Sequence, residues 1–254
     1  MDLTFEELIK GKGTRIKDQS YYPTEAYVQP FFERMSKMTK DFRIKVELPK
    51  QMTLDGDDTD VTFNRVWIQA VLPNEMSVAN HQQVIGLVYG LDCKKPIYKM
   101  YVGGLNMACT NLCVFQPEAL EVREIEEGKY FNYRLLDNLI SQTDEVSAML
   151  NKMKSMTFDS DYRSTSEQLG NWIKRSKVEF INNGFGKVKI ASSIPVSAYD
   201  LLYTNEKSPY FVGEADTDMF NVYNAFTQCI TDSLKKDIMN QFEKTLLVSQ
   251  ILGL

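Results

Sequence analysis

Cysteine and histidine are scarce in this sequence, which has four cysteines and one histidine among 254 residues. The cysteines form no CxxC pair, and four are too few for a disulfide framework in a chain of this length. A structural zinc site needs four nitrogen or sulfur ligands brought together, so we expect no metal and no other cofactor. We expect free, buried thiols at Cys93, Cys109, Cys113 and Cys229.

Long apolar runs are also missing. No run approaches the roughly 20 residues that a helix needs to span a bilayer. The first residues, 1–7, are acidic where a secretory segment would be basic and then apolar. We therefore expect no membrane contact and a location in the cytoplasm of the cell that makes the protein.

A general basic excess is absent, since the net charge is −5, and this argues against indiscriminate wrapping of nucleic acid. The charge instead changes sign in blocks. Residues 10–50 hold ten Lys/Arg against five Asp/Glu, 151–190 hold eight against four, and 200–254 hold four against eight. Two interpretations remain open: a basic groove on an acidic body, or ordinary surface heterogeneity.

The order of the periodic segments predicts an α+β fold. No Pro/Gly/Ser-rich linker interrupts the chain, so we expect a single domain over 1–254. Within it we expect a helical segment in 1–41, a sheet in 42–116 and a mainly helical part in 117–254. Strands clustered early and helices clustered late favour α+β over alternating α/β.

Period-two alternation from Phe42 to Leu48 predicts the first strand. Four more strands are expected at 61–72, where Pro73 ends the strand, and at 83–91, 96–102 and 106–115, the last two separated by a break at Gly103-Gly104. The connections are short, with a hairpin tip at 92–95, which favours antiparallel pairing of about five strands.

Apolar residues at helical spacing predict long helices that pack on this sheet. We expect helices at 31–38, with Pro30 in the first turn, and at 135–153, 168–180 and 220–246. A short strand is expected at 188–191, and 199–213 is expected to be irregular.

Basic and aromatic residues gather in the predicted hairpin over 94–101. Lysines neutralise phosphates and exposed rings stack on bases, so this hairpin is the best candidate for a nucleic-acid surface. In a strand, Lys99 shares a face with Tyr101. The candidate nucleic-acid-binding residues are Arg43, Lys45, Lys94, Lys95, Tyr98, Lys99, Tyr101, Lys174, Arg175 and Lys177. The alternative is an edge hairpin that its lysines keep soluble.

Catalysis is not indicated by any residue pattern. His81 could act as a general base, but no GxSxG nucleophile motif occurs, and general-base chemistry needs placed partners. We interpret His81 as a structural histidine at a strand entry and expect no catalytic residue. An enzyme acting on nucleotides through Asn80, His81 and Asn111 is the least supported function.

Three short elements carry a resemblance to a known family. They are Asn80-His81, then Cys109 with Asn111, then Tyr223-Asn-Ala-Phe-Thr227, which includes Asn224. Together they resemble an uncharacterised family of phages, prophages and plasmids with Asn-Ser-His-Asp-Gly, Cys-x-Asn and Tyr-Asn-Ala-x-Thr elements. Gln82-Gln83 stands here where that family has Asp-Gly, and Thr231-Asp232 replaces a later histidine. The resemblance implies a mobile-element origin and the cytoplasm of a phage-infected bacterium.

Two functions follow as hypotheses. An early antiparallel sheet followed by a long helix is similar to the single-strand annealing recombinases, which implies a protein that binds and anneals single-stranded DNA in replication or recombination. That resemblance also implies a homo-oligomer. The alternative is a protein-binding module without enzymatic activity, either an anti-defence factor or a virion component, which the acidic net charge and the tyrosine content suit.

Overall fold

The computed structural model describes most of the chain in separate segments. These are residues 8, 15–16, 19–21, 24–47, 65–75, 81–92, 95–106, 112–114, 131–158, 162–177, 180–182, 186–188, 190–234 and 238–252. Residues 1–7, 9–14 and 48–64, where the helical segment and the second strand are expected to begin, and residues 93–94 of the expected hairpin tip lie outside the described residues.

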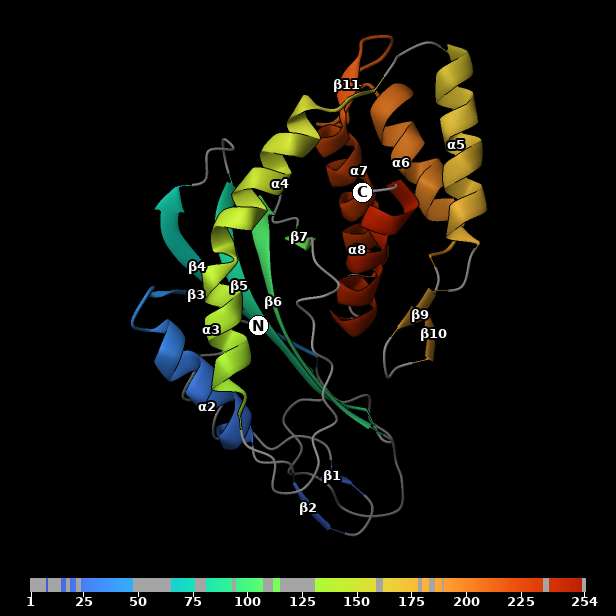
Figure 1. Ribbon diagram of the computed structural model, residues 1–254. Helices are drawn as coiled ribbons and strands as arrows, with labels where there is room; N and C mark the ends of the chain where they lie inside the picture. The colour runs from blue at the N-terminus through green and yellow to red at the C-terminus, as the bar shows by residue number, and fades with distance from the viewer. Residues whose placement is uncertain are drawn as a thin grey trace.

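One antiparallel sheet forms the centre of the molecule, so the α+β class is confirmed (Figure 1). Its strands follow the order β3-β4-β5-β6-β7, in which every strand lies beside its neighbour in sequence. Their bounds are β3 (Asp41–Glu47), β4 (Arg65–Glu75), β5 (His81–Asp92), β6 (Lys95–Asn106) and β7 (Leu112–Val114). The short connections that the sequence offers are enough for such a meander, because antiparallel neighbours need no crossover.

Two predicted strand ends are wrong. Pro73 does not end β4 but lies inside it, exposed, where the register with β5 shifts between Val71 and Glu75. A bulge tolerates proline because the missing N–H is not needed for the ladder there. Gly103 and Gly104 do not break β6 either, since β5 and β7 pair with them on both sides.

Seven described helices and three short ladders surround the sheet. The helices are α2 (Thr24–Met35), α3 (Tyr133–Ser141), α4 (Thr143–Ser155), α5 (Tyr162–Ser176), α6 (Ser193–Tyr203), α7 (Met219–Ser233) and α8 (Ile238–Leu252). The ladders pair β1 (Arg15–Ile16) with β2 (Gln19–Tyr21), β8 (Thr157–Phe158) with β11 (Thr217–Asp218), and β9 (Phe180–Asn182) with β10 (Gly186–Val188).

Both of the longest predicted helices are in fact pairs of helices. The pattern over 135–153 is divided at Gln142, whose N–H turns back to the carbonyl of Leu139. The pattern over 220–246 is divided after Ser233, and α7 and α8 pack against each other. The apolar period continues through the first division because α3 and α4 pack into the same core, and through the second because α7 and the start of α8 each bury an apolar face, α7 in that core and Phe242 and Leu246 in a separate cluster.

Three smaller predictions also need correction. Pro30 lies inside α2, not in its first turn, so the helix begins six residues before it. The stretch 199–213 begins with the last turns of α6 and is irregular only after Tyr203. Helix α5 ends at Ser176, and Phe180 starts β9.

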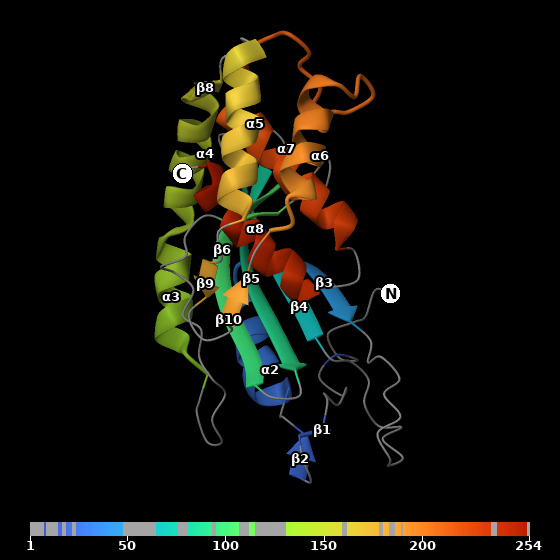
Figure 2. The same cartoon turned by 90° about the vertical axis from the view of Figure 1, so that its right-hand side faces the viewer.

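The sheet is buried on both faces (Figures 1 and 2). Helices α2, α3 and α4 lie on one side of it, and α8 crosses the other. Val66, Ile68 and Ala70 face the first side, while Trp67 and Val71 pack under Phe242 and Leu246 of α8 in a separate apolar cluster. Because both faces are buried, apolar residues follow one another almost without interruption in the sequences of these strands.

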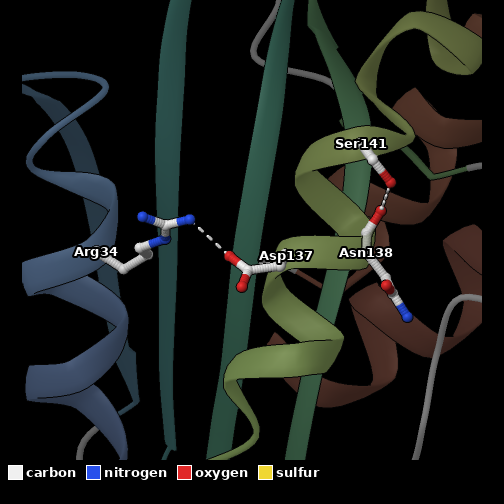
Figure 3. A network of polar contacts seen from close by, with 4 residues as sticks. All are labelled: Arg34, Asp137, Asn138 and Ser141. Carbon is white, nitrogen blue, oxygen red and sulfur yellow. Dashed lines mark hydrogen bonds and ion pairs between the residues drawn. The ribbon is translucent and has the colours of Figure 1, made fainter.

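An exposed ion pair joins α2 to α3 (Figure 3). The Arg34 guanidinium lies 2.7 Å from an Asp137 carboxylate oxygen, and the two side chains are 43% and 55% exposed. Beside it, the hydroxyl of Ser141 donates to the carbonyl of Asn138 within α3. At this exposure the ion pair contributes less than about 1 kcal/mol, so the packing on the sheet holds the two helices together.

Tyr101 lies flat across Gly86 in the middle of the α8 side. The two residues are direct cross-strand partners, and a Cβ at position 86 would occupy the space of the Tyr101 ring. Trp67 Nε1 and Gln69 Nε2 both donate to the Tyr101 hydroxyl, and the Phe242 ring covers it at a centroid distance of 5.0 Å. Glycine is required here for a close approach.

Replacing Gly86 by alanine is expected to destabilise the protein by about 1–3 kcal/mol or more, because the rigid sheet prevents the buried ring from moving away. Gly170→Ala is the matched control, since a Cβ there meets nothing within 4 Å. That change in α5 is expected to stabilise by about 0.5–1 kcal/mol. Urea unfolding measures both, and equal effects of the two variants would contradict this packing.

Candidate nucleic-acid interface

Five basic residues follow one another along the end of α2, the turn after it and β3. They are Arg34, Lys37, Lys40, Arg43 and Lys45, which we call the basic ridge. Residues 34–45 contain these five bases and a single acid, Asp41. The acidic net charge of the chain is therefore not shared by this segment, and local charge decides what a surface attracts.

Short hydrogen bonds fix the turn in the basic ridge. The N–H groups of Met38 and Thr39 both donate to the carbonyl of Met35, at 2.8 Å and 3.0 Å. The Thr39 hydroxyl donates to the carbonyl of Val71 at 2.5 Å and accepts from the N–H of Asp41 at 3.0 Å. The turn is thus tied to β4, and its two lysines extend from a rigid base.

Arg43 and Lys45 lie on the α8 side of β3, opposite Gln69 and Trp67 of β4. The Lys45 ammonium lies 5.3 Å from the centre of the Trp67 ring. Desolvation at this position lowers the Lys45 pKa, and the positive charge of Arg43 lowers it further. Two like charges in this arrangement favour an anion that neutralises both.

Lys99 and Tyr101, by contrast, are not part of any exposed surface. They share a face of β6 as the sequence predicts, but α8 covers that face, and the two side chains are 1% and 0% exposed. The Lys99 ammonium lies 3.2 Å from a carboxylate oxygen of Glu243 on α8. The prediction that these two side chains meet a nucleic acid is therefore wrong for this fold, because a helix more than 130 residues further along the chain occupies their place.

The other predicted binding residues lie apart from the basic ridge. Lys174 and Lys177 are exposed at the end of α5, and Arg175 donates to the carbonyl of Ile251 at 2.8 Å, which ties α5 to the last turn of α8. Helix α8 contacts both α5 and β3. Lys95 and Tyr98 belong to β6, but their side chains, like all of Lys94, lie outside the described residues.

Two of the three motif elements meet in the fold. His81 begins β5 and stacks edge-on against Phe220 in the first turn of α7, with ring centres 4.8 Å apart. Asn224 and Thr227 are buried on the same helix and bond to the carbonyls of Phe220 and Asn224 at 2.9 Å and 3.1 Å. These bonds within α7 indicate a structural role for Asn224 and Thr227, while the structural role of His81 stays a prediction. Asn80, Cys109 and Asn111 lie outside the described residues.

A depression of about 480 Å³ opens beside this contact, between α4, the β8–β11 ladder and α7. Its lining residues are Lys154, Thr157, Asp216, Thr217, Asp218, Phe220 and Asn221. The Lys154 ammonium lies 5.3 Å from the centre of the Phe220 ring, and the Asp218 carboxylate accepts from the N–H of Asn221 at 2.7 Å.

Neither a cluster of metal ligands nor a membrane-spanning helix occurs in the part of the chain that the structure describes. In these ranges, no three His, Cys, Asp or Glu side chains lie close enough to hold a metal ion. No helix among the same residues combines the length and the apolar character needed to cross a bilayer. Cys229 is a buried free thiol whose pKa is raised to about 12, first by burial and then by Asp232 and Asp200.

Sequence reasoning missed Arg34, Lys37 and Lys40 as binding candidates. The signal was present in the excess of bases over 10–50, but no single motif marked these residues. The turn that joins α2 to the edge strand places Lys37 and Lys40 next to β3, which carries Arg43 and Lys45, while Arg34 stays on α2 beside Asp137.

Removing the carboxylate of Glu243 is expected to cost about 3–5 kcal/mol, because Glu243→Gln leaves the buried Lys99 ammonium without its anionic partner. The double variant Lys99→Met/Glu243→Leu removes both charges and is expected to regain most of this loss. Urea unfolding of the two variants measures the difference. A double variant no more stable than Glu243→Gln would contradict a buried, charge-compensated pair.

The same pair predicts a pH dependence. Burial lowers the Lys99 pKa below its ordinary value of 10.5, while Glu243 raises it. In Glu243→Gln no carboxylate raises the Lys99 pKa. Burial then keeps the Lys99 pKa of the folded state below that of the unfolded state, so the folded state loses the Lys99 proton at a lower pH. The free energy of unfolding then increases as pH rises between the folded and unfolded pKa. The difference in the free energy of unfolding between Glu243→Gln and wild type is expected to shrink from neutral pH towards 10.5. A difference that grows over this range would contradict the predicted pH dependence.

The comparisons with known proteins add no family to this picture. No family model, curated protein or solved structure matches the chain. The resemblance of the three short elements to a phage-related family therefore stays a prediction, and a function for the basic ridge has to be argued from this chain's own side chains.

Proposed function

We propose that this protein binds single-stranded DNA through the basic ridge, in the annealing steps of phage replication or recombination within the host cytoplasm. The observation that carries the proposal is the set of four bases, Lys37, Lys40, Arg43 and Lys45, on a rigid turn and an edge strand, next to Arg34, whose charge Asp137 already compensates. Lysine and arginine release condensed counterions when they neutralise phosphates, and this supplies most of the affinity of non-specific binding.

The shape of the basic ridge suits an extended strand. Arg43 and Lys45 point to the same side of β3, about 6–7 Å apart along the strand. Lys37 and Lys40 continue the positive charge beyond the start of that strand. Met38, which is 37% exposed between them, offers an apolar contact for a base.

The burial of Tyr101 and Trp67 limits what the proposed site does. Stacking of bases on aromatic rings gives single-strand binders part of their affinity, and these rings are fully covered by α8. Binding by the ridge is therefore expected to be mainly electrostatic, with little sequence preference and a strong dependence on salt.

A salt series with a fluorescent oligonucleotide tests the proposal. Four phosphate contacts, without Arg34, which Asp137 holds, predict a slope of log K against log salt of about −2.8, at roughly 0.7 per contact. Lys37→Gln/Lys40→Gln removes two contacts and is expected to reduce the slope by about 1.4.

The matched control is Lys152→Gln/Lys207→Gln, which removes two exposed lysines of α4 and of the loop after α6. It has the same net charge as the ridge variant and is expected to leave the slope unchanged. Absence of binding at low salt, or equal losses in both variants, would overturn the proposal.

A protein-binding module is the second candidate, and Tyr133 favours it. This side chain is 53% exposed at the start of α3, and its ring packs edge-on against Phe131 at 4.9 Å. Exposed tyrosines are common anchors of protein interfaces. Specific capture of one host or virion protein that is lost in Tyr133→Ser, together with no binding of oligonucleotides, would favour this candidate over DNA binding.

A further inference from the structure

A second charged surface lies on α6 and the loop that follows it. Residues 200–218 contain five acids and one base, the reverse of the basic ridge. Hydrogen bonds order the loop, since the N–H of Val212 donates to the carbonyl of Leu202 at 2.8 Å and Asn221 Nδ2 donates to the carbonyl of Tyr210 at 3.1 Å. The acids are thus held on a fixed framework.

Exposed apolar side chains accompany these acids. Val196 and Phe211 are 48% and 36% exposed, and with Met38 and Tyr133 they make up the large exposed apolar side chains of the described residues. Val196, Tyr199 and Asp200 fall on the side of α6 that faces away from its buried residues, at helical spacing. We call this surface the acidic face and define it by Val196, Tyr199, Asp200, Glu206, Phe211 and Glu214.

The acidic face and the basic ridge are complementary in both charge and apolar content. The ridge presents Met38 between Lys37 and Lys40, and the acidic face presents Val196 and Phe211 among carboxylates. Opposite charges around apolar anchors are the arrangement that steers and orients protein association.

The two surfaces lie too far apart to pair within one chain. In both views the loop between α6 and β11 lies at the upper end of the molecule, and α2 lies at the lower part, beyond the sheet (Figures 1 and 2). Pairing between copies would therefore join unlike surfaces, and such head-to-tail contacts build rings or filaments.

We infer that this protein self-associates head to tail, with the basic ridge of one copy docked on the acidic face of the next. The contact is mainly electrostatic, with a small apolar centre, so it is weak and sensitive to salt. It gives the homo-oligomer that the resemblance to annealing recombinases implies a specific surface and a direction.

The same basic ridge is proposed to bind both single-stranded DNA and the acidic face of a neighbouring copy, so DNA binding and self-association are linked. A single strand on the ridge competes with the acidic face of a neighbouring copy, so an oligonucleotide is expected to dissociate the assembly. This competition depends on the proposed DNA binding, whereas self-association does not. The two are therefore tested separately.

Charge reversal tests self-association without DNA, by sedimentation velocity at low salt over a range of concentrations. The wild-type protein is expected to associate, and Lys37→Glu/Lys40→Glu and Glu206→Lys/Glu214→Lys are each expected to associate at least tenfold more weakly. An equimolar mixture of the two variants restores opposite charges at both contacts and is expected to recover association.

Lys174→Glu/Lys177→Glu is the matched control for the ridge variant, because it changes the net charge equally on exposed lysines of α5. It is expected to associate like wild type, and circular dichroism checks that every variant is folded. A wild-type protein that stays monomeric at low salt, or a mixture that does not recover association, would overturn the inference. Association without dissociation by an oligonucleotide would leave self-assembly standing and contradict only the competition.

Discussion

The packing of α8 across the sheet is the contact on which the rest of the structure depends. Tyr101 lies on Gly86, Phe242 lies on Tyr101, and Glu243 compensates the charge of Lys99 in the same layer. This contact turns a sheet with one exposed face into a sheet buried on both sides. It also removes the most promising aromatic and basic residues of the sequence from solvent.

The covering helix has a direct consequence for function. On the α8 side of the sheet, α8 leaves the edge strand β3 accessible, and the turn before β3 adds two further exposed lysines. The lysines and arginines there stand on a backbone fixed by Thr39 and Val71, and burial, followed by repulsion from Arg43, lowers the pKa of Lys45. Such a ridge is suited to phosphates or to carboxylates of a neighbouring copy, and among the described residues it has no exposed ring with which to read bases.

Much of the sheet could be predicted from local patterns. Phe42, Ile44 and Val46 alternate with charged residues because β3 is an edge strand and only one of its faces is buried, and the shared face of Lys99 and Tyr101 follows from the strand period alone. Their burial could not be predicted, because it is caused by Phe242 and Glu243, which no local pattern connects to β6. The divisions at Gln142 and after Ser233 were missed for a related reason, since apolar spacing reports which residues face a core and not whether the helix axis turns.

The candidate site shows the same limit. Arg43 and Lys45 were found because they alternate within a strand, whereas Arg34, Lys37 and Lys40 become part of the ridge only through the turn at 36–40. Of the family-like residues, His81 and Asn224 both contact Phe220, and Thr227 bonds to the Asn224 carbonyl within α7, so all three are buried in packing. Spacing in a sequence identifies residues that belong together more readily than it reveals whether they face solvent.

Photocrosslinking of a thymine-analogue oligonucleotide, followed by peptide mass spectrometry, tests the central claim most directly. If α8 keeps the sheet closed and the ridge holds the strand, crosslinks fall in peptides that span residues 34–45. Crosslinks to peptides that carry Trp67 or Tyr101 would show instead that α8 opens and that the aromatic face binds the DNA, which would contradict both the closed sheet and binding by the ridge.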